Sequence, residues 1–362
     1  MQRANYQLLH DLRTHSPENK RLGVQNIDEL LDVFAREKTP VIEISSPESG
    51  GGKSQLIYYV AALCVLPSNY KNRKTGGRDG AVVLLDTDGK LDIRRLYQIA
   101  HGVLLHNLRT AEETLTENDI RTLLHDSLHH MHVFRPQTSS SLLATVTSLD
   151  KYLFDVSRHH SSARPLHALL LDSASAFYWQ DRLRDETART EDIGRGVADI
   201  THDRDTNRRF HMAVLYRDLA AELRRLQAVF GCSLVFSTWG LFRAPPDRAA
   251  PYAHLWTGPP SFRPHLPHPW GALADLRLVV QRDAVRPYPV TASLADIERD
   301  GPVRQAVVRR GKFSAWVDTW NQENWPLGVA AALRKMPDNG GFPFWIRQDG
   351  VFMDDLMDDI ST

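Results

Sequence analysis

Short apolar runs alternate along the chain with longer stretches in which apolar residues recur every three or four positions. The first run is Val41, Ile42 and Ile44, and residues 53–66 after it have the spacing of a helix. Four later runs are each separated from the next by enough residues for a crossover helix. These runs are Ala81–Leu85, His132–Phe134, Ala168–Leu171 and Ser233–Phe236. The alternation predicts an α/β fold with a doubly wound, mostly parallel sheet.

The clearest helical pattern precedes the last of these strands. Its apolar residues, from Met212 to Phe230, fall on one face, and Gly231 is expected to end the helix. A shorter helical pattern between Ile27 and Phe34 is expected to pack as a lead-in segment. Three later runs are expected to add antiparallel strands to one edge of the sheet. They are Leu276–Gln281, Val303–Val308 and Phe313–Val317.

Three stretches interrupt the alternation. Residues 67–80 are polar and are expected to form a loop, and residues 180–209 are dense in charges of both signs. Residues 243–270 contain eight prolines and three histidines, which excludes a central strand or helix. We therefore expect this third stretch to be a loop.

Composition limits the class of protein. The 362 residues are 42% hydrophobic, which is ample for a core, and no apolar run approaches the roughly 18 residues of a membrane span. Basic and acidic residues both number 44, so no global positive field attracts nucleic acid, and any DNA contact must be local. Cys64 and Cys232 lie in apolar stretches, as expected for reduced, buried thiols. Neither secretion nor membrane insertion is expected.

Candidate nucleotide chemistry lies between the first strand and its helix, in the glycine-rich sequence SPESGGGKS of residues 46–54. Glycines let backbone N–H groups point at phosphate oxygens, Lys53 offers a positive charge, and Ser54 offers a hydroxyl to Mg²⁺. The predicted nucleotide-binding residues are Glu48, Ser49, Gly50, Gly51, Gly52, Lys53 and Ser54. A purely structural turn is the alternative, which the strand–loop–helix context disfavours.

This loop departs from the standard phosphate-loop pattern. Glycine is expected five residues before Gly52, where the chain has Pro47; alternatively Ser46 occupies that place and the loop is one residue longer. Either arrangement alters the geometry of the loop.

Carboxylates that follow two of the strands are candidates for the same site. Asp172 ends the run Ala168–Leu171, at the edge where ligands bind in such sheets, and is predicted to hold Mg²⁺ through water from a neighbouring strand. Asp86 and Asp88 follow an earlier strand. For Asp88 a catalytic role and a helix-capping role remain open.

Several segments together resemble one family. They are LLDTDGKLDIRRL at 84–96, SSSLLATVTSLD at 139–150, LLLDSASAFYWQDR at 169–182, FRPHLPHPWGALADLRLVVQRD at 262–283 and FWIRQDGVF at 344–352. These segments are similar to the eukaryotic RecA-family recombinase paralogues. The resemblance implies a RecA-like P-loop core that binds ATP and Mg²⁺ in the nucleus. It also implies a role in homologous-recombination repair of double-strand breaks and damaged replication forks.

The resemblance further implies partners and a division of the chain. Such paralogues form a heteromeric complex with other recombinase paralogues and help the recombinase assemble on single-stranded DNA, so single-stranded or branched DNA is an expected partner through that complex. The lead-in residues 1–38 are too few for the recombinase's helical DNA-binding domain. The RecA-like domain is expected over 39–352, followed by an acidic tail over 353–362. Loop insertions are expected near 180–209, 243–270 and 284–340.

The chain departs from the family pattern at two catalytic positions. The resemblance places Asp88 where active recombinases have a glutamate that polarises the attacking water, and Gly240 where they have a glutamine that senses the γ-phosphate. A shorter carboxylate arm misplaces the general base, and glycine has no side chain to sense anything. We therefore predict ATP binding with weak or no hydrolysis; a catalytically active DNA-dependent ATPase is the alternative.

Two further groups of residues are candidates for binding. Arg243, Arg248 and Arg263 are candidates for DNA contact, near aromatic residues able to stack on bases. Protein binding, or no binding role, is the alternative for this proline-rich segment. These aromatic residues are Tyr252, Trp256 and Phe262. A histidine cluster precedes the strand at 132–134 and is interpreted as cations at a helix terminus rather than as a metal site. Its members are His125, His129, His130 and His132.

Overall fold

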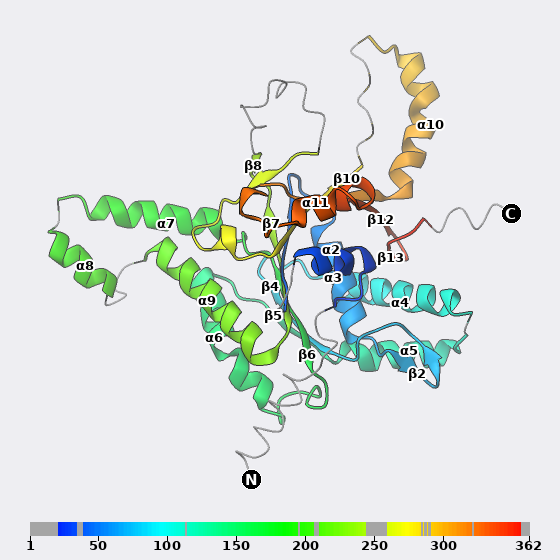
Figure 1. The fold of residues 1–362 in the computed structure, drawn as a ribbon, viewed down its shortest axis with the longest axis horizontal. Helices are drawn as coiled ribbons and strands as arrows, with labels where there is room; N and C mark the ends of the chain where they lie inside the picture. Colours follow the sequence, from blue (N-terminus) through cyan, green and yellow to red (C-terminus); the bar gives the residue numbers. More distant parts are fainter. Residues whose placement is uncertain are drawn as a thin grey trace.

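A nine-stranded sheet forms the centre of the molecule (Figure 1). The structure, a computed structural model, describes residues 21–355 apart from 35–38, 113, 195, 206–209, 244–258, 284, 286, 287, 289, 290 and 321. The strands of the sheet are β1 Val41–Ser46, β4 Ala81–Asp86, β5 Met131–Phe134, β6 Leu166–Asp172, β7 Ser233–Trp239, β10 Leu276–Arg282, β11 Lys312–Val317, β12 Phe342–Arg347 and β13 Gly350–Phe352. Their order is β13-β12-β11-β10-β1-β7-β6-β4-β5. Neighbouring strands from β10 to β5 are parallel.

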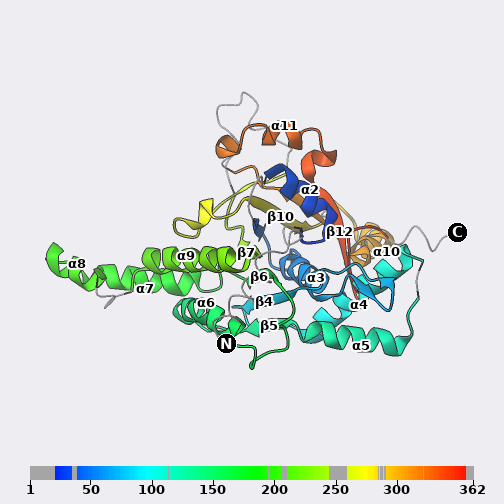
Figure 2. The same ribbon diagram turned by 60° about the horizontal axis from the view of Figure 1, so that its bottom comes forward.

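Helices cover both faces of this sheet (Figures 1 and 2). The α-helices are α2 Gln25–Phe34, α3 Lys53–Val65, α4 Ile93–Thr110, α5 Glu117–Leu128, α6 Ser139–Phe154, α7 Tyr178–Glu191, α8 Val197–Asp205, α9 Met212–Phe230, α10 Leu294–Arg310 and α11 Val329–Leu333. One buried cluster joins α2, α3, α4 and α5 to the sheet, and a second joins α6, α7 and α9 to the opposite face. The prediction of a doubly wound α/β fold is therefore confirmed.

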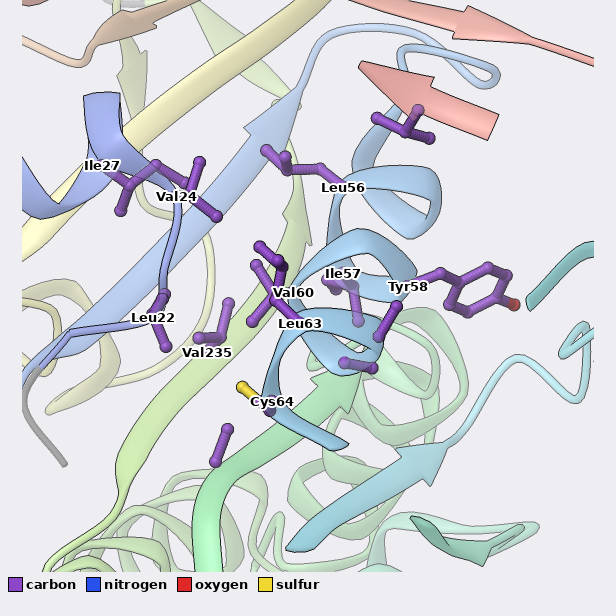
Figure 3. Packing of buried hydrophobic residues seen from close by; sticks show 14 of the residues in the cluster. Leu22, Val24, Ile27, Leu56, Ile57, Tyr58, Val60, Leu63, Cys64 and Val235 are labelled. Carbon is purple, nitrogen blue, oxygen red and sulfur yellow. The ribbon is translucent and has the colours of Figure 1, made fainter. Parts of the chain in front are cut away.

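Helix α3 lies at the centre of the first cluster, as Figure 3 shows. Val60 and Cys64 of this helix pack in the same apolar cluster as Val235 of β7 and Leu22 and Ile27 of the N-terminal part. The helix that carries Lys53 is thus held by apolar residues distant in sequence. Cys64 and Cys232 are both buried free thiols, as predicted.

The predictions for the C-terminal strands were partly wrong. Strand β10 is parallel to β1, and only β11, β12 and β13 extend the sheet with antiparallel pairs. Residues Val303–Val308 form no strand, because they lie within helix α10. A capping box of Ser293 and Asp296 begins this helix, and Gly311 in the left-handed conformation ends it. These capping signals outweigh the β-branched residues between them.

Two predicted loops also contain regular structure. Residues 67–80 include a small hairpin of β2 Asn69–Tyr70 and β3 Arg73–Lys74. Most described residues of 180–209 lie in α7 and α8, where charges of opposite sign one turn apart form ion pairs such as Arg182–Glu186. The dense charges of this segment therefore stabilise helices.

Two short paired strands lie at the start of the proline-rich stretch and near its end. Strands β8 Phe242–Arg243 and β9 Phe262–Arg263 pair antiparallel, while residues 244–258 and the tail residues 356–362 lie outside the described residues. Within the described part of the chain, no helix combines the length and the apolar character needed to cross a lipid bilayer.

Candidate nucleotide-binding site

The glycine-rich loop joins β1 to α3 and depends on its glycines. Gly50 and Gly52 adopt left-handed φ angles of 78° and 96°, and Gly52 precedes the first turn of α3. A Cβ atom on Gly51 would lie 1.8 Å from the Ser46 hydroxyl oxygen, which itself donates to the Glu48 carbonyl at 3.0 Å. The backbone between Ser46 and Lys53 is therefore folded too tightly to accept a side chain at Gly51, as a phosphate cradle requires.

This loop lines an open cleft of about 580 Å³, a volume typical of small-molecule sites. All the predicted nucleotide-binding residues border the cleft, together with Asp88 and Asp172. Burial lowers the pKa of Lys53, while the nearby charges of Asp172 and Asp88 act in the opposite direction. The predicted cation and both predicted carboxylates thus meet in one cleft at the carboxyl ends of the parallel strands.

Asp172 reaches the cleft from a strand that is one position removed. We expected its strand to be the immediate neighbour of β1, which was wrong, because β7 lies between β1 and β6. The side chain of Asp172 is buried, and one of its oxygens accepts a 2.6 Å hydrogen bond from the Ser237 hydroxyl on β7. Ser237 therefore fixes the orientation of this carboxylate.

The two aspartates after β4 have different roles. The buried Asp86 carboxylate accepts hydrogen bonds from the backbone N–H groups of Lys90 and Leu91 and from Arg135, at 3.0–3.1 Å. Asp88 instead borders the cleft. Burial raises the pKa of Asp88, the Lys90 ammonium opposes this, and the carboxylates of Asp172 and Asp86 add to it.

The helix-capping alternative for Asp88 was wrong. Helix α4 begins after Asp92, whose carboxylate accepts hydrogen bonds from the backbone N–H groups of Arg94 and Arg95. Asp88 is thus left facing the cleft, available for a nucleotide or its metal ion.

Sequence reasoning missed several residues that border the cleft. Lys90 follows the Asp86–Asp88 segment closely and could have been found from that proximity. Phe313 and Ile346 come from the antiparallel strands β11 and β12, and they lie 3.1 and 3.2 Å from the position that a Cβ atom on Gly52 would occupy. No local signal marks these two residues, because only the packing of the C-terminal strands brings them to the loop.

Gly240 connects the loop to the segment that follows β7. Its backbone N–H donates to the Ser46 carbonyl at 2.8 Å, and a Cβ atom there would lie 3.1 Å from both Ser46 and Phe262. Any side chain at this position would require its surroundings to shift. Glycine is therefore suited to the close approach of these two segments.

The candidate DNA-binding residues are only partly described. Arg263 is exposed on β9, and the backbone of Arg243 pairs with Phe262, while Arg248 lies outside the described residues. Phe262 is buried, so the prediction that it stacks on bases was wrong. The other two predicted stacking residues, Tyr252 and Trp256, also lie outside the described residues.

Comparison with known proteins gives partial matches. No family model matches the chain. DNA repair protein XRCC2 of Mus musculus is 32% identical over 157 residues, which cover 42% of this chain and 47% of that protein. DNA repair and recombination protein RadA of Aeropyrum pernix is 32% identical over 101 residues, 27% of this chain and 30% of that protein.

A third relative is DNA repair protein RAD51 homolog 2 of Homo sapiens, which is 26% identical over 134 residues, 37% of this chain and 29% of that protein. The match thus spans less than half the length of each of these three relatives. Their names all refer to DNA repair, and they support the family resemblance and the fold inferred from the sequence.

Proposed function

We infer from its partial similarity to DNA repair proteins that this chain belongs to the RecA family of recombinases and their paralogues, and we propose that it binds ATP with Mg²⁺ and serves DNA repair by homologous recombination. In this proposal the protein acts in the nucleus, in the repair of double-strand breaks and damaged replication forks. The observation that carries the proposal is the meeting of Lys53 and Asp172 in one cleft beside the glycine-rich loop.

Each of these residues has a defined part in binding. The backbone N–H groups from Glu48 to Gly52 cradle the phosphates, and Lys53 neutralises the outer phosphates. The Ser54 hydroxyl and the Asp172 carboxylate border the same cleft and would hold a Mg²⁺ ion, which would screen the phosphate charges. The hydrogen bond from Ser237 to Asp172 keeps that carboxylate oriented for this role.

Two features support weak or absent hydrolysis. The carboxylate of Asp88 has a shorter arm than a glutamate, and a general base must lie within hydrogen-bond reach of the water it activates. Gly240 has no side chain that reports on the γ-phosphate, and its N–H is already bonded to Ser46. An active DNA-dependent ATPase is the competing proposal.

Exposed apolar side chains support a role within a complex. On α7 Trp179 is 50% exposed and Leu183 is 65% exposed, and Val197 on α8 is also exposed. Trp179 and Leu183 lie one turn apart on α7, and adjacent exposed apolar side chains are typical of interaction surfaces. We propose that another recombinase paralogue covers them and that the complex assists recombinase assembly on single-stranded DNA. Arg243, Arg248 and Arg263 make the direct DNA contacts.

Nucleotide binding is tested with a fluorescent ATP analogue and the purified full chain. Loss of a charge-assisted hydrogen bond costs about 1.5–3 kcal/mol, so Lys53→Ala should weaken binding roughly tenfold or more. Lys151→Ala is the matched control, because Lys151 is exposed on α6, outside the cleft. Equal affinities for the two variants would contradict the proposed site.

Hydrolysis is tested by phosphate release with and without single-stranded DNA. We expect release close to background in both conditions and no effect of Asp88→Ala. DNA-stimulated release that Asp88→Ala abolishes would establish the competing proposal instead.

The assembly role is tested by co-purification and mass-spectrometric identification of bound chains. A recombinase paralogue is the expected partner, and Leu183→Asp should reduce its recovery, whereas Gln180→Ala, also exposed on α7, should not. Recovery that Leu183→Asp leaves unchanged would exclude this surface.

A further inference from the structure

Helix α5 ends in a group of side chains that the nucleotide site does not use. His125 lies in its last turn and His129 follows the helix as its C-cap residue. The two rings meet edge to face, with centroids 4.4 Å apart. Ligand atoms of His125, Asp126 and His129 all lie within 4.8 Å of one another, and all three residues are exposed. Three groups that bind metals are therefore already gathered at one point.

A fourth group comes from another part of the chain. His160 lies on the connection between α6 and β6, and its ring centroid is 5.9 Å from that of His129. This connection is anchored at Ser161, whose hydroxyl lies 3.0 Å from a ring nitrogen of His130 and 3.0 Å from one of His132. The half-buried His130 and the buried His132 thus position the loop that brings His160 to the end of α5.

We propose that His125, Asp126, His129 and His160 bind one divalent transition-metal ion of the zinc class. Imidazole and carboxylate are common ligands of such ions, and histidines one helical turn apart lie on the same face of a helix. Tetrahedral coordination with bonds of about 2.0–2.1 Å places ligand atoms roughly 3.4 Å apart. The ligand atoms of His125, Asp126 and His129 already lie within 4.8 Å of one another, so side-chain rotations that move each atom by about an ångström bring them to that distance.

The electrostatics of the helix end favours the same occupant. The carboxyl end of a helix carries a partial negative charge, and the Asp126 carboxylate lies beside His125, at 3.5 Å. The preference of a helix terminus for cations, which explained these histidines from sequence, is satisfied equally by a bound metal ion.

The site lies apart from the nucleotide cleft. Strand β5 begins directly after α5 and runs parallel to β4 and β6, whose carboxyl ends face the cleft. The histidines therefore lie at the amino ends of these strands, on the opposite edge of the sheet. A bound ion links α5 to the connection before β6 and stabilises this edge without touching a nucleotide.

The test is calorimetric titration of the full, untagged chain with Zn²⁺, with Mg²⁺ as the comparison ion. We expect one Zn²⁺ per chain, no competition by Mg²⁺, and weaker binding in acid, because the ligand imidazoles must be neutral. The variant His125→Asn/His129→Asn should lose at least about tenfold in affinity, since even residues that only orient metal ligands contribute that much. It should also lose the rise in melting temperature that Zn²⁺ produces.

The matched control is His101→Asn/His268→Asn, which removes two histidines outside the cluster and should bind Zn²⁺ as the unmodified chain does. Circular dichroism of the metal-free variants checks that both remain folded. If the unmodified chain binds no Zn²⁺, or if the cluster variant and the control bind it equally, the proposed site is overturned.

Discussion

Replacement of Arg277 on β10 should destabilise the fold more than replacement of a charged residue on the surface. Its guanidinium lies 2.8 Å from the Glu43 carboxylate on β1 and 3.3 Å from that of Asp318, with only 10% of its side chain exposed. Glu43 also accepts a 2.6 Å hydrogen bond from Thr238, and Asp318 accepts from the backbone N–H of Phe262. This buried network connects the strand before the phosphate loop to the base of the proline-rich segment.

The cost follows from the buried carboxylates that remain. Arg277→Met keeps much of the side-chain volume but leaves Glu43 and Asp318 without their cation. Removal of one partner of a buried ion pair typically costs about 3–5 kcal/mol, and we expect a loss of this size at neutral pH. The matched control is Arg299→Met on α10, whose ion-paired side chain is 73% exposed and should contribute about 1 kcal/mol or less.

The pH dependence gives a second readout. Burial raises the pKa of Asp318 in the folded chain, and the nearby Arg277 charge opposes that rise. Without Arg277 the pKa rises further, so the folded variant binds a proton that the unfolded chain lacks, and lower pH favours folding of the variant. The loss measured by urea unfolding should therefore shrink as the pH falls from 7 toward 5. A loss no larger than that of Arg299→Met, or one that grows in acid, would refute this reasoning.

Two smaller predictions concern the loop and the helix after β4. Gly51→Ala should reduce nucleotide affinity about tenfold or more, because the new Cβ atom collides with the Ser46 hydroxyl. The double variant Gly51→Ala/Ser46→Ala should recover part of the lost affinity. Gly301→Ala is the control, because a Cβ atom at Gly301 meets no atom within 4 Å. Asp92→Ala should lower the free energy of unfolding in urea by about 1 kcal/mol, because helix α4 loses its N-cap. Asp88→Ala should lower it clearly less. Equal losses in the two variants would contradict the separate roles of these aspartates.

The sequence predicted those parts of the fold that local patterns determine. The parallel strands have continuous apolar runs because both faces of the sheet are covered, and the loop before Lys53 has a strong local signature. The prediction of a strand at Val303–Val308 was wrong because the β-branched residues suggest a strand, whereas the capping residues around them determine a helix. The sequence also could not predict that β10 is parallel to its neighbour, because only the tertiary arrangement places β10 beside β1.

In the candidate nucleotide site, too, some features could be predicted from the sequence and others only from the fold. The candidate binding residues Lys53 and Asp172, which border the cleft, were identifiable from the sequence because of their chemistry. The strand between them was not, yet β7 supplies Ser237 to orient Asp172 and leads into Gly240, whose N–H is bonded to Ser46. A catalytic pattern can therefore be incomplete at the residues that touch a water or a phosphate while the hydrogen bonds that shape the cleft are present. The proposed ATP-binding subunit needs only the hydrogen bonds that shape the cleft, whereas an efficient ATPase also needs a correctly placed general base, for which Asp88 has a short arm.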